Sequence, residues 1–222
     1  MLMHRMILLA TMISVAIAAS AQHQLVPAAY KSIKEVEGDL DKDGIAEKVV
    51  VYDVTRDDPA DGVERDVVIF KKQGNNWAIW YRSKTAIGDS KSGGMMGDPF
   101  GDIEIKNGVL VISQEGGSSW KWSMHDKYRF QNGQMVLIGY TSYGGKPCEY
   151  WESIDYNLAT GKLVYSKEYE RCKDGEGAQF VYKKENETFM HKLKAPILFE
   201  KRESVKEKPS FITPRYRRAI YI

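Results

Sequence analysis

Residues that often carry out chemistry are scarce in this sequence. It contains two cysteines and four histidines among 222 residues, and they do not form the closely spaced clusters that bind structural zinc. An excess of charge is also lacking, because 32 basic residues nearly balance 30 acidic ones. Proteins that bind nucleic acid usually present a strongly basic surface. We therefore expect neither a zinc site nor a nucleic-acid partner.

Long hydrophobic runs are missing after the first residues of the chain. Residues 7–18 form one uncharged apolar run, preceded by Arg5 and followed by the small-residue sequence Ala-Ser-Ala at 19–21. This order is typical of a removable signal peptide, and the run is shorter than the roughly 20 residues that span a bilayer. We expect a signal peptide at 1–21 and a mature chain from Gln22 without a transmembrane anchor. Its location would be periplasmic or secreted.

Alternation of apolar and polar residues dominates from about residue 46, which predicts β-strands. Asn-Gly pairs at 107–108 and 132–133 indicate tight hairpin turns, because both turn positions favour positive φ. The implied registers place apolar pairs on one face of each hairpin: Ile105 with Leu110, Ile103 with Ile112, Phe130 with Met135, and Tyr128 with Leu137.

The strand pattern as a whole predicts an all-β protein with one domain. We expect an antiparallel meander of about ten strands, arranged as a sandwich, a barrel or a propeller-like fold. Residues 28–35 are compatible with either a short helix or a strand, and 197–201 is a weak strand candidate. The β domain is expected over 22–201, with a charged C-terminal tail at 202–222.

The two cysteines, Cys148 and Cys172, are expected to form a disulfide. Strand-like segments at 149–157 and 162–171 are joined by a short loop, and the hairpin that they predict brings both cysteines to its open end. An even number of cysteines in an exported chain also favours a disulfide, although two free thiols are the alternative. The cross-strand pairs that this register implies are Tyr156 with Leu163, Glu152 with Lys167, and Tyr150 with Tyr169.

Residues 38–47 read Gly-Asp-Leu-Asp-Lys-Asp-Gly-Ile-Ala-Glu and predict a cation-binding loop. Oxygen atoms at alternate positions can converge on one hard cation, and the glycine at position 44 permits the necessary turn. Ca²⁺ suits the loop better than Mg²⁺ because many protein oxygens are offered. The alternative is an acidic turn without a metal. The expected ligands are the carboxylates of Asp39, Asp41, Asp43 and Glu47 and the backbone carbonyl of Ile45.

This segment resembles the Asp-x-Asp-x-Asp-Gly-x-x-Asp loops that precede strands in integrin-type and related propeller repeats, with Glu47 at a position usually held by Asp. A second pattern comprises Gly-Asp-Pro-Phe at 97–100 and Gly-Gly-Ser-Ser-Trp-Lys-Trp at 116–122. Together with the Gly-Asp-Leu-x-x-Asp-Gly loop, it is similar to a functionally uncharacterised family of small exported bacterial proteins. The resemblance covers roughly residues 36–140. It implies common descent and a periplasmic location, and no particular activity.

The candidates for a hydrolytic site are weak. Ser118 and Ser119 lie among glycines but lack the Gly-x-Ser-x-Gly sequence of a nucleophile elbow. His125 and Asp126 are adjacent in the sequence, which more often reflects an exposed strand end than part of a catalytic triad. An enzyme would require a concave pocket that combines Ser118, His125 and Asp98.

Trp120 and Trp122 suggest a binding surface instead. They alternate with Lys121 beside a glycine-rich segment, so their indoles are expected on the same face. Exposed indoles would stack on a glycan or a peptide, whereas buried ones would fill the core, which is the commoner role. We expect a non-enzymatic binding or envelope-associated protein. The alternative is a hydrolase acting on envelope or extracellular polymers.

Overall fold

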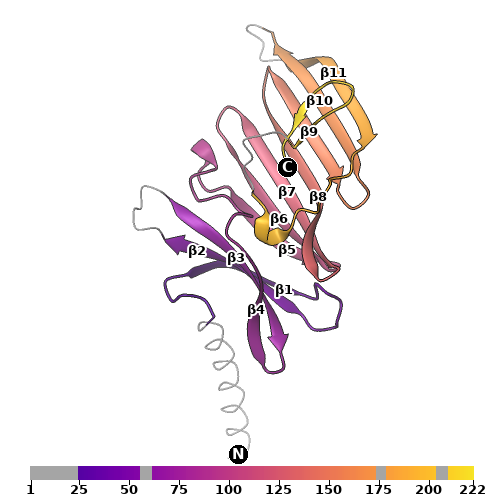
Figure 1. The fold of residues 1–222 in the computed structure, drawn as a ribbon. Helices are drawn as coiled ribbons and strands as arrows, with labels where there is room; N and C mark the ends of the chain where they lie inside the picture. Colours follow the sequence, from indigo (N-terminus) through magenta and orange to yellow (C-terminus); the bar gives the residue numbers. More distant parts are fainter. Residues whose placement is uncertain (1–24, 56–61, 174–178, 204–209) are drawn as a thin grey trace, which may run out of the picture.

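The computed structural model describes residues 25–55, 62–173, 179–203 and 210–222, and β-strands dominate these segments (Figure 1). One sheet has four strands in the order β1-β2-β3-β4. Its strands are β1 (Lys31–Gly38), β2 (Glu47–Thr55), β3 (Val63–Gln73) and β4 (Asn76–Ser83). The expected all-β class is confirmed, and residues 28–35 lead into a strand, not a helix.

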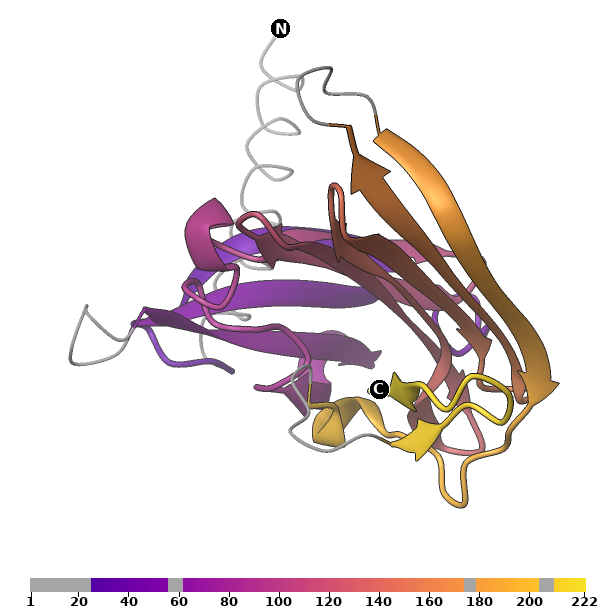
Figure 2. The ribbon, with the colours of Figure 1, turned by 90° about the horizontal axis from the view of Figure 1, so that it is seen from above.

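The second sheet has seven antiparallel strands in the order β11-β10-β9-β8-β7-β6-β5. Chain neighbours are therefore sheet neighbours, as a meander requires. Its strands are β5 (Phe100–Lys106), β6 (Val109–Gly117), β7 (Lys121–Gln131), β8 (Gln134–Lys146), β9 (Tyr150–Asn157), β10 (Lys162–Cys172) and β11 (Gln179–Met190). Figure 2 shows that this sheet is curved and that the C-terminal segment of the chain lies on its concave side.

The two sheets pack together as an open sandwich. Alternate residues of β2 and β3 form a shared core with β5 and β6. Many of its members are fully buried aliphatic residues, so this layer excludes water and supplies the main hydrophobic stabilisation. They include Val49, Val51, Val67, Ile69, Ile103, Leu110 and Ile112.

Local turn chemistry fixes the registers of the hairpins. Asn107 and Asn132 have positive φ values of 54° and 52°, as the Asn-Gly turns predict. All the cross-strand pairs expected for β5–β6, β7–β8 and β9–β10 are present. The weak strand candidate at 197–201 does not form a full strand: Leu198 makes an isolated antiparallel β-bridge with Val136, and the chain then forms a single-turn 3-10 helix, η3 (Phe199–Lys201). This turn buries Phe199 completely against the core.

The end of the chain differs from the expected charged tail. Residues 210–222 form a hairpin of β12 (Phe211–Ile212) and β13 (Ala219–Ile220), which lies on the concave side of the large sheet (Figure 2). Ile220 and Ile222 are buried. The apolar residues at the chain end therefore dock, and the backbone N–H of Arg215 and the guanidinium of Arg218 donate hydrogen bonds to Glu187 and Glu185 on β11.

The expected signal peptide at 1–21 lies outside the described residues. Among the residues that the structure describes, no helix has the length and apolar character needed to cross a membrane.

Candidate functional site

The acidic loop between β1 and β2 folds around its own backbone. Asp39 accepts hydrogen bonds from the backbone N–H groups of Lys42 (2.6 Å) and Gly44 (2.9 Å). Gly44 adopts a positive φ of 86°, which a glycine tolerates without strain. Side-chain oxygens of Asp39, Asp41 and Asp43 lie within 4.8 Å of one another. The loop thus gathers the three aspartates that the sequence singled out.

Glu47 belongs to the same cluster although it begins β2. It is fully buried, and its Oε2 accepts a hydrogen bond from the backbone N–H of Leu40 at 2.8 Å. Ile45, the expected carbonyl ligand, is exposed, and its N–H donates to Asp43. One carboxylate oxygen, Oδ1 of Asp41, is buried without a hydrogen-bond partner among the described residues.

A lysine from the neighbouring strand enters this cluster. The ammonium group of Lys71 on β3 donates hydrogen bonds to Asp41, to Asp43 (2.7 Å) and to Glu47 (3.1 Å). Burial alone would lower the pKa of Lys71, but these hydrogen bonds raise it above its ordinary value. The hydrogen bond from Lys71 lowers the pKa of Asp43. The cluster therefore holds a cationic group supplied by the protein.

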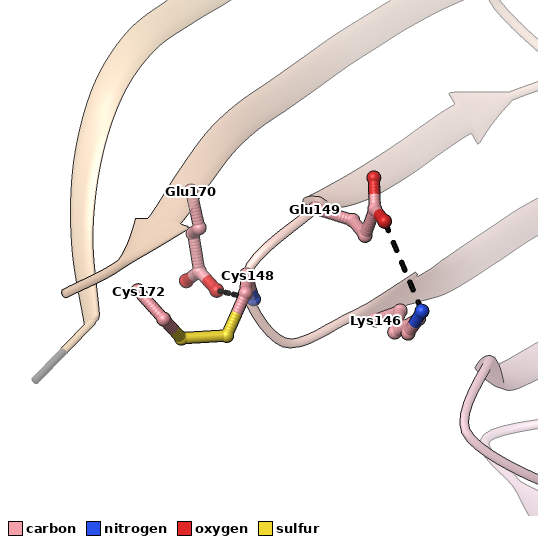
Figure 3. The surroundings of a disulfide bond; sticks show 5 residues. All are labelled: Lys146, Cys148, Glu149, Glu170 and Cys172. Carbon is pink, nitrogen blue, oxygen red and sulfur yellow. Dashed lines mark hydrogen bonds and ion pairs between the residues drawn. A yellow bond between two sulfur atoms is a disulfide. The ribbon is translucent and has the colours of Figure 1, made fainter. Parts of the chain in front are cut away.

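The disulfide forms where the sequence predicts it. Cys148 and Cys172 are bonded, with their Cα atoms 5.1 Å apart, at the open end of the β9–β10 hairpin (Figure 3). Glu170 accepts a hydrogen bond from the backbone N–H of Cys148 at 3.3 Å. The bridge joins the loop that leads into β9 to the end of β10.

Trp120 and Trp122 line a single open cavity of about 270 Å³, which we call the aromatic groove. Its lining comes from β7, β8, β9 and the residues that flank them. The indole of Trp120 is 42% exposed and lies 5.0 Å from the ring of Tyr150. Trp122 is half-buried and packs against the core. The lining residues are Trp120, Trp122, Ser123, Met124, Tyr140, Ser142, Tyr143, Gly144, Gly145, Tyr150 and Glu152.

Glycines lie on both sides of Trp122, on the two neighbouring strands. Gly116 on β6 and Gly144 on β8 are its two cross-strand partners. A Cβ at Gly116 would lie 2.7 Å from the Trp122 ring, so only glycine allows the indole to lie flat there. At Gly144 a Cβ would lie 3.1 Å from the backbone oxygen of Lys121 and 3.6 Å from the Cβ of Trp122, and Gly144 also pairs with Glu152 on β9.

A polar cluster borders the far side of the groove. Oε2 of Glu152 accepts hydrogen bonds from the hydroxyl of Tyr165 (2.8 Å) and the ammonium of Lys167 (3.2 Å). That ammonium also lies 3.4 Å from the ring centroid of Tyr150, within the range of a cation–π interaction. Burial is the main cause that raises the pKa of Tyr165, followed by the charge of Glu152. Tyr165 therefore stays protonated and can act as a donor.

The candidate hydrolytic residues do not come together. His125 faces the outer side of the sheet, where its Nδ1 is hydrogen-bonded to Ser113 at 2.8 Å. Asp126 is buried in an ion pair with Arg202. Asp98 pairs with Arg65. In the described part of the chain, no hydrogen bond joins Ser118, His125 and Asp98.

Sequence reasoning missed several residues of these two sites. Nothing near residue 71 signals that Lys71 contacts the acidic loop. Tyr150 and Glu152 were recognised only as members of a hairpin, although the Gly-Gly pairs at 116–117 and 144–145 were an available signal for space beside the tryptophans.

Comparisons of the chain with protein-family models, curated proteins and solved structures found no match. The resemblance to exported bacterial proteins and to calcium loops stays a prediction. Function has to be inferred from the sites themselves, since an all-β fold alone does not define an activity.

Proposed function

We propose that this protein is an exported, non-enzymatic binding protein whose aromatic groove binds a glycan. The observation that carries the proposal is an open cavity lined by Trp120, Tyr150 and Glu152, in which Trp120 is 42% exposed and its ring lies 5.0 Å from that of Tyr150. The Cys148–Cys172 disulfide supports an oxidising location such as the periplasm or the extracellular space.

The chemistry of the groove suits a sugar. The C–H face of a sugar ring is apolar and packs against an indole, while its hydroxyl groups need hydrogen-bonding partners. Ser123, Ser142 and Glu152 offer such partners along the lining of the groove. The cavity of about 270 Å³ is near the lower end of small-molecule sites, roughly 300 Å³. It would hold a short part of a longer chain.

A peptide fits this position less well. Extended peptides commonly bind by adding a strand to a free sheet edge. The groove lies over β7, β8 and β9, and each of these strands is paired on both sides within the sheet. Their backbone groups are therefore already engaged, and recognition must come from side chains.

Glycan titrations with a matched tryptophan control test this proposal. Intrinsic fluorescence and calorimetry would follow binding of soluble oligosaccharides from envelope and extracellular polymers. We expect Trp120→Ala to weaken binding by roughly tenfold or more, as loss of a central aromatic contact does. Trp77→Ala, on β4, should bind normally. Absence of binding to the wild-type protein, or equal binding by both variants, would contradict the proposal.

We also propose that the acidic loop binds Ca²⁺ as a structural ion. The grouping of Asp39, Asp41 and Asp43 supports this, and the buried, unpartnered Oδ1 of Asp41 is an oxygen that a cation would satisfy. Glu47 and the carbonyl of Ile45 complete the proposed ligand set. Bound Ca²⁺ would tie the loop to the start of β2.

Thermal unfolding tests the calcium proposal. Excess Ca²⁺ should raise the melting temperature of the wild-type protein relative to a chelator, because a ligand that binds only the folded state stabilises it. The rise should vanish in Asp41→Ala. A melting temperature that does not respond to Ca²⁺ in the wild-type protein would exclude a structural calcium site.

A further inference from the structure

The ammonium of Lys71 contacts two aspartates of the acidic loop and Glu47 at the start of β2. An ammonium group has three N–H donors, and here they meet three carboxylates, those of Asp41, Asp43 and Glu47. Lys71 lies on β3, beyond the strand that the loop leads into. Formation of the sheet, not the loop sequence, therefore delivers this positive charge to the cluster.

We propose that Lys71 is the built-in cation of this loop, and that Ca²⁺ binds only by displacing its ammonium from Asp41, Asp43 and Glu47. The inference rests on the calcium proposal above and adds a competitor within the protein. Lys71 would then set the affinity of the loop for calcium.

Ca²⁺ and the ammonium of Lys71 would compete because both need the same carboxylate oxygens. Lys71 contacts Oδ2 of Asp41, Oδ2 of Asp43 and Oε1 of Glu47, so these oxygens face a common point. Ca²⁺ binds oxygens at about 2.3–2.6 Å and repels an adjacent ammonium. The two cations therefore cannot share these oxygens.

The ammonium leaves one acceptor unsatisfied. With its three donors engaged, Lys71 has none left for Oδ1 of Asp41, which is buried and unpartnered. Ca²⁺ accepts six to eight oxygen ligands and can be bound by both oxygens of one carboxylate. The exchange of Lys71 for Ca²⁺ would thus satisfy an oxygen that the ammonium cannot reach.

The indole of Trp80 lies beside Lys71, and its fluorescence can report displacement of the ammonium. The ammonium of Lys71 lies 4.9 Å from the ring centroid of Trp80 on β4, and the lysine side chain is 22% exposed. It therefore has a path to solvent. Displacement of the ammonium would remove a positive charge from the indole face, so the emission of Trp80 should change when Ca²⁺ binds.

Calorimetric titration of Ca²⁺ into Lys71→Met tests the proposal. This variant keeps the apolar stem and removes the charge, so we expect its Ca²⁺ dissociation constant to fall by roughly tenfold or more. Its melting temperature in chelator should also drop and recover with Ca²⁺. The control Lys72→Met removes the adjacent lysine, which lies over Trp77, and should behave as wild type.

The outcomes separate the two proposals. Equal Ca²⁺ affinity of wild type and Lys71→Met would overturn the role of Lys71 and leave the calcium site intact. Binding by Lys71→Met alone would support the role of Lys71 and reject calcium in the wild-type protein. Absence of binding by both proteins would overturn both. If Lys71→Met does not fold, the fluorescence emission of the wild-type protein is measured with and without Ca²⁺. An emission change that is lost in Trp80→Phe supports displacement of the ammonium. Absence of an emission change in the wild-type protein opposes displacement.

Discussion

The concave face of the seven-stranded sheet has a covered part and an open part. Where the small sheet and η3 cover it, Leu110 and Ile112 are fully buried. Where the cover ends, the same face presents Trp120, the glycines that line the groove and the Glu152–Lys167 pair. Both parts belong to one regular meander. The extent of the covering layer, not a change in the order of the strands, therefore decides which part of this face stays open.

Breaking the buried ion pair of the covered part should have the largest effect on the free energy of unfolding. Asp126 and Arg202 are each 1% exposed and lie 2.7 Å apart, and the hydroxyl of Tyr128 also donates to Asp126. Asp126→Asn would leave a buried guanidinium uncompensated, and we expect a loss of about 3–5 kcal/mol of unfolding free energy. Chemical denaturation measures this loss.

An exposed ion pair supplies the control for that experiment. Asp102 pairs with Lys34 at 2.7 Å but is 58% exposed. Asp102→Asn should cost less than about 1 kcal/mol, because water screens the pair. Comparable losses in the two variants would mean that Asp126 is not shielded from solvent, and the contrast between covered and open parts would weaken.

Removal of the disulfide is expected to cause the next largest loss of unfolding free energy, in this case beside the open part of the sheet. Cys148 and Cys172 are 24 residues apart, and the chain-entropy model assigns about 3.5 kcal/mol to a loop of this size. Replacing both cysteines with serine should lower the unfolding free energy accordingly. A loss below about 1 kcal/mol would indicate that the β9–β10 pairing alone holds this end of the sheet.

Sequence reasoning succeeded where the determinants are local. The Asn-Gly turns and the β9–β10 loop each fix a register within a few residues, so all the expected cross-strand pairs form. The acidic loop was recognised for the same reason. Lys71 was not, because it meets Asp41 from 30 residues away. The groove likewise depends on which part of the sheet the small sheet leaves uncovered, and no local pattern encodes that.

Acid should weaken the attachment of the C-terminal hairpin to β11. Hydrogen bonds from Arg218, opposed by burial and supported by Lys183 and Tyr169, lower the pKa of Glu185 from 4.5 to about 2. Its folded pKa is below the unfolded one, so it stabilises the protein above about pH 4.5. This contribution disappears as the pH falls towards 2.

The variant Glu185→Gln isolates this contribution. At pH 7 we expect it to cost about 1–3 kcal/mol, the usual range for hydrogen bonds to charged groups. At pH 2 the difference from wild type should be much smaller, because Glu185 is then protonated in the unfolded state and about half protonated in the folded state. Unfolding curves at the two pH values give the comparison. A difference independent of pH would mean that packing, not charge, anchors the hairpin.

The smallest effect on stability is expected for Trp120→Ala, although it removes the largest type of side chain. Trp120 is 42% exposed and its main ring contact is with Tyr150, so we expect a loss of about 0.5–1.5 kcal/mol. Trp122→Ala is the matched comparison two residues away, and it should cost more because that indole packs against the core. Equal losses would place Trp120 among the structural residues. A small loss at Trp120, combined with loss of glycan binding, would mean that the exposed indole serves the ligand, since it contributes little to the fold.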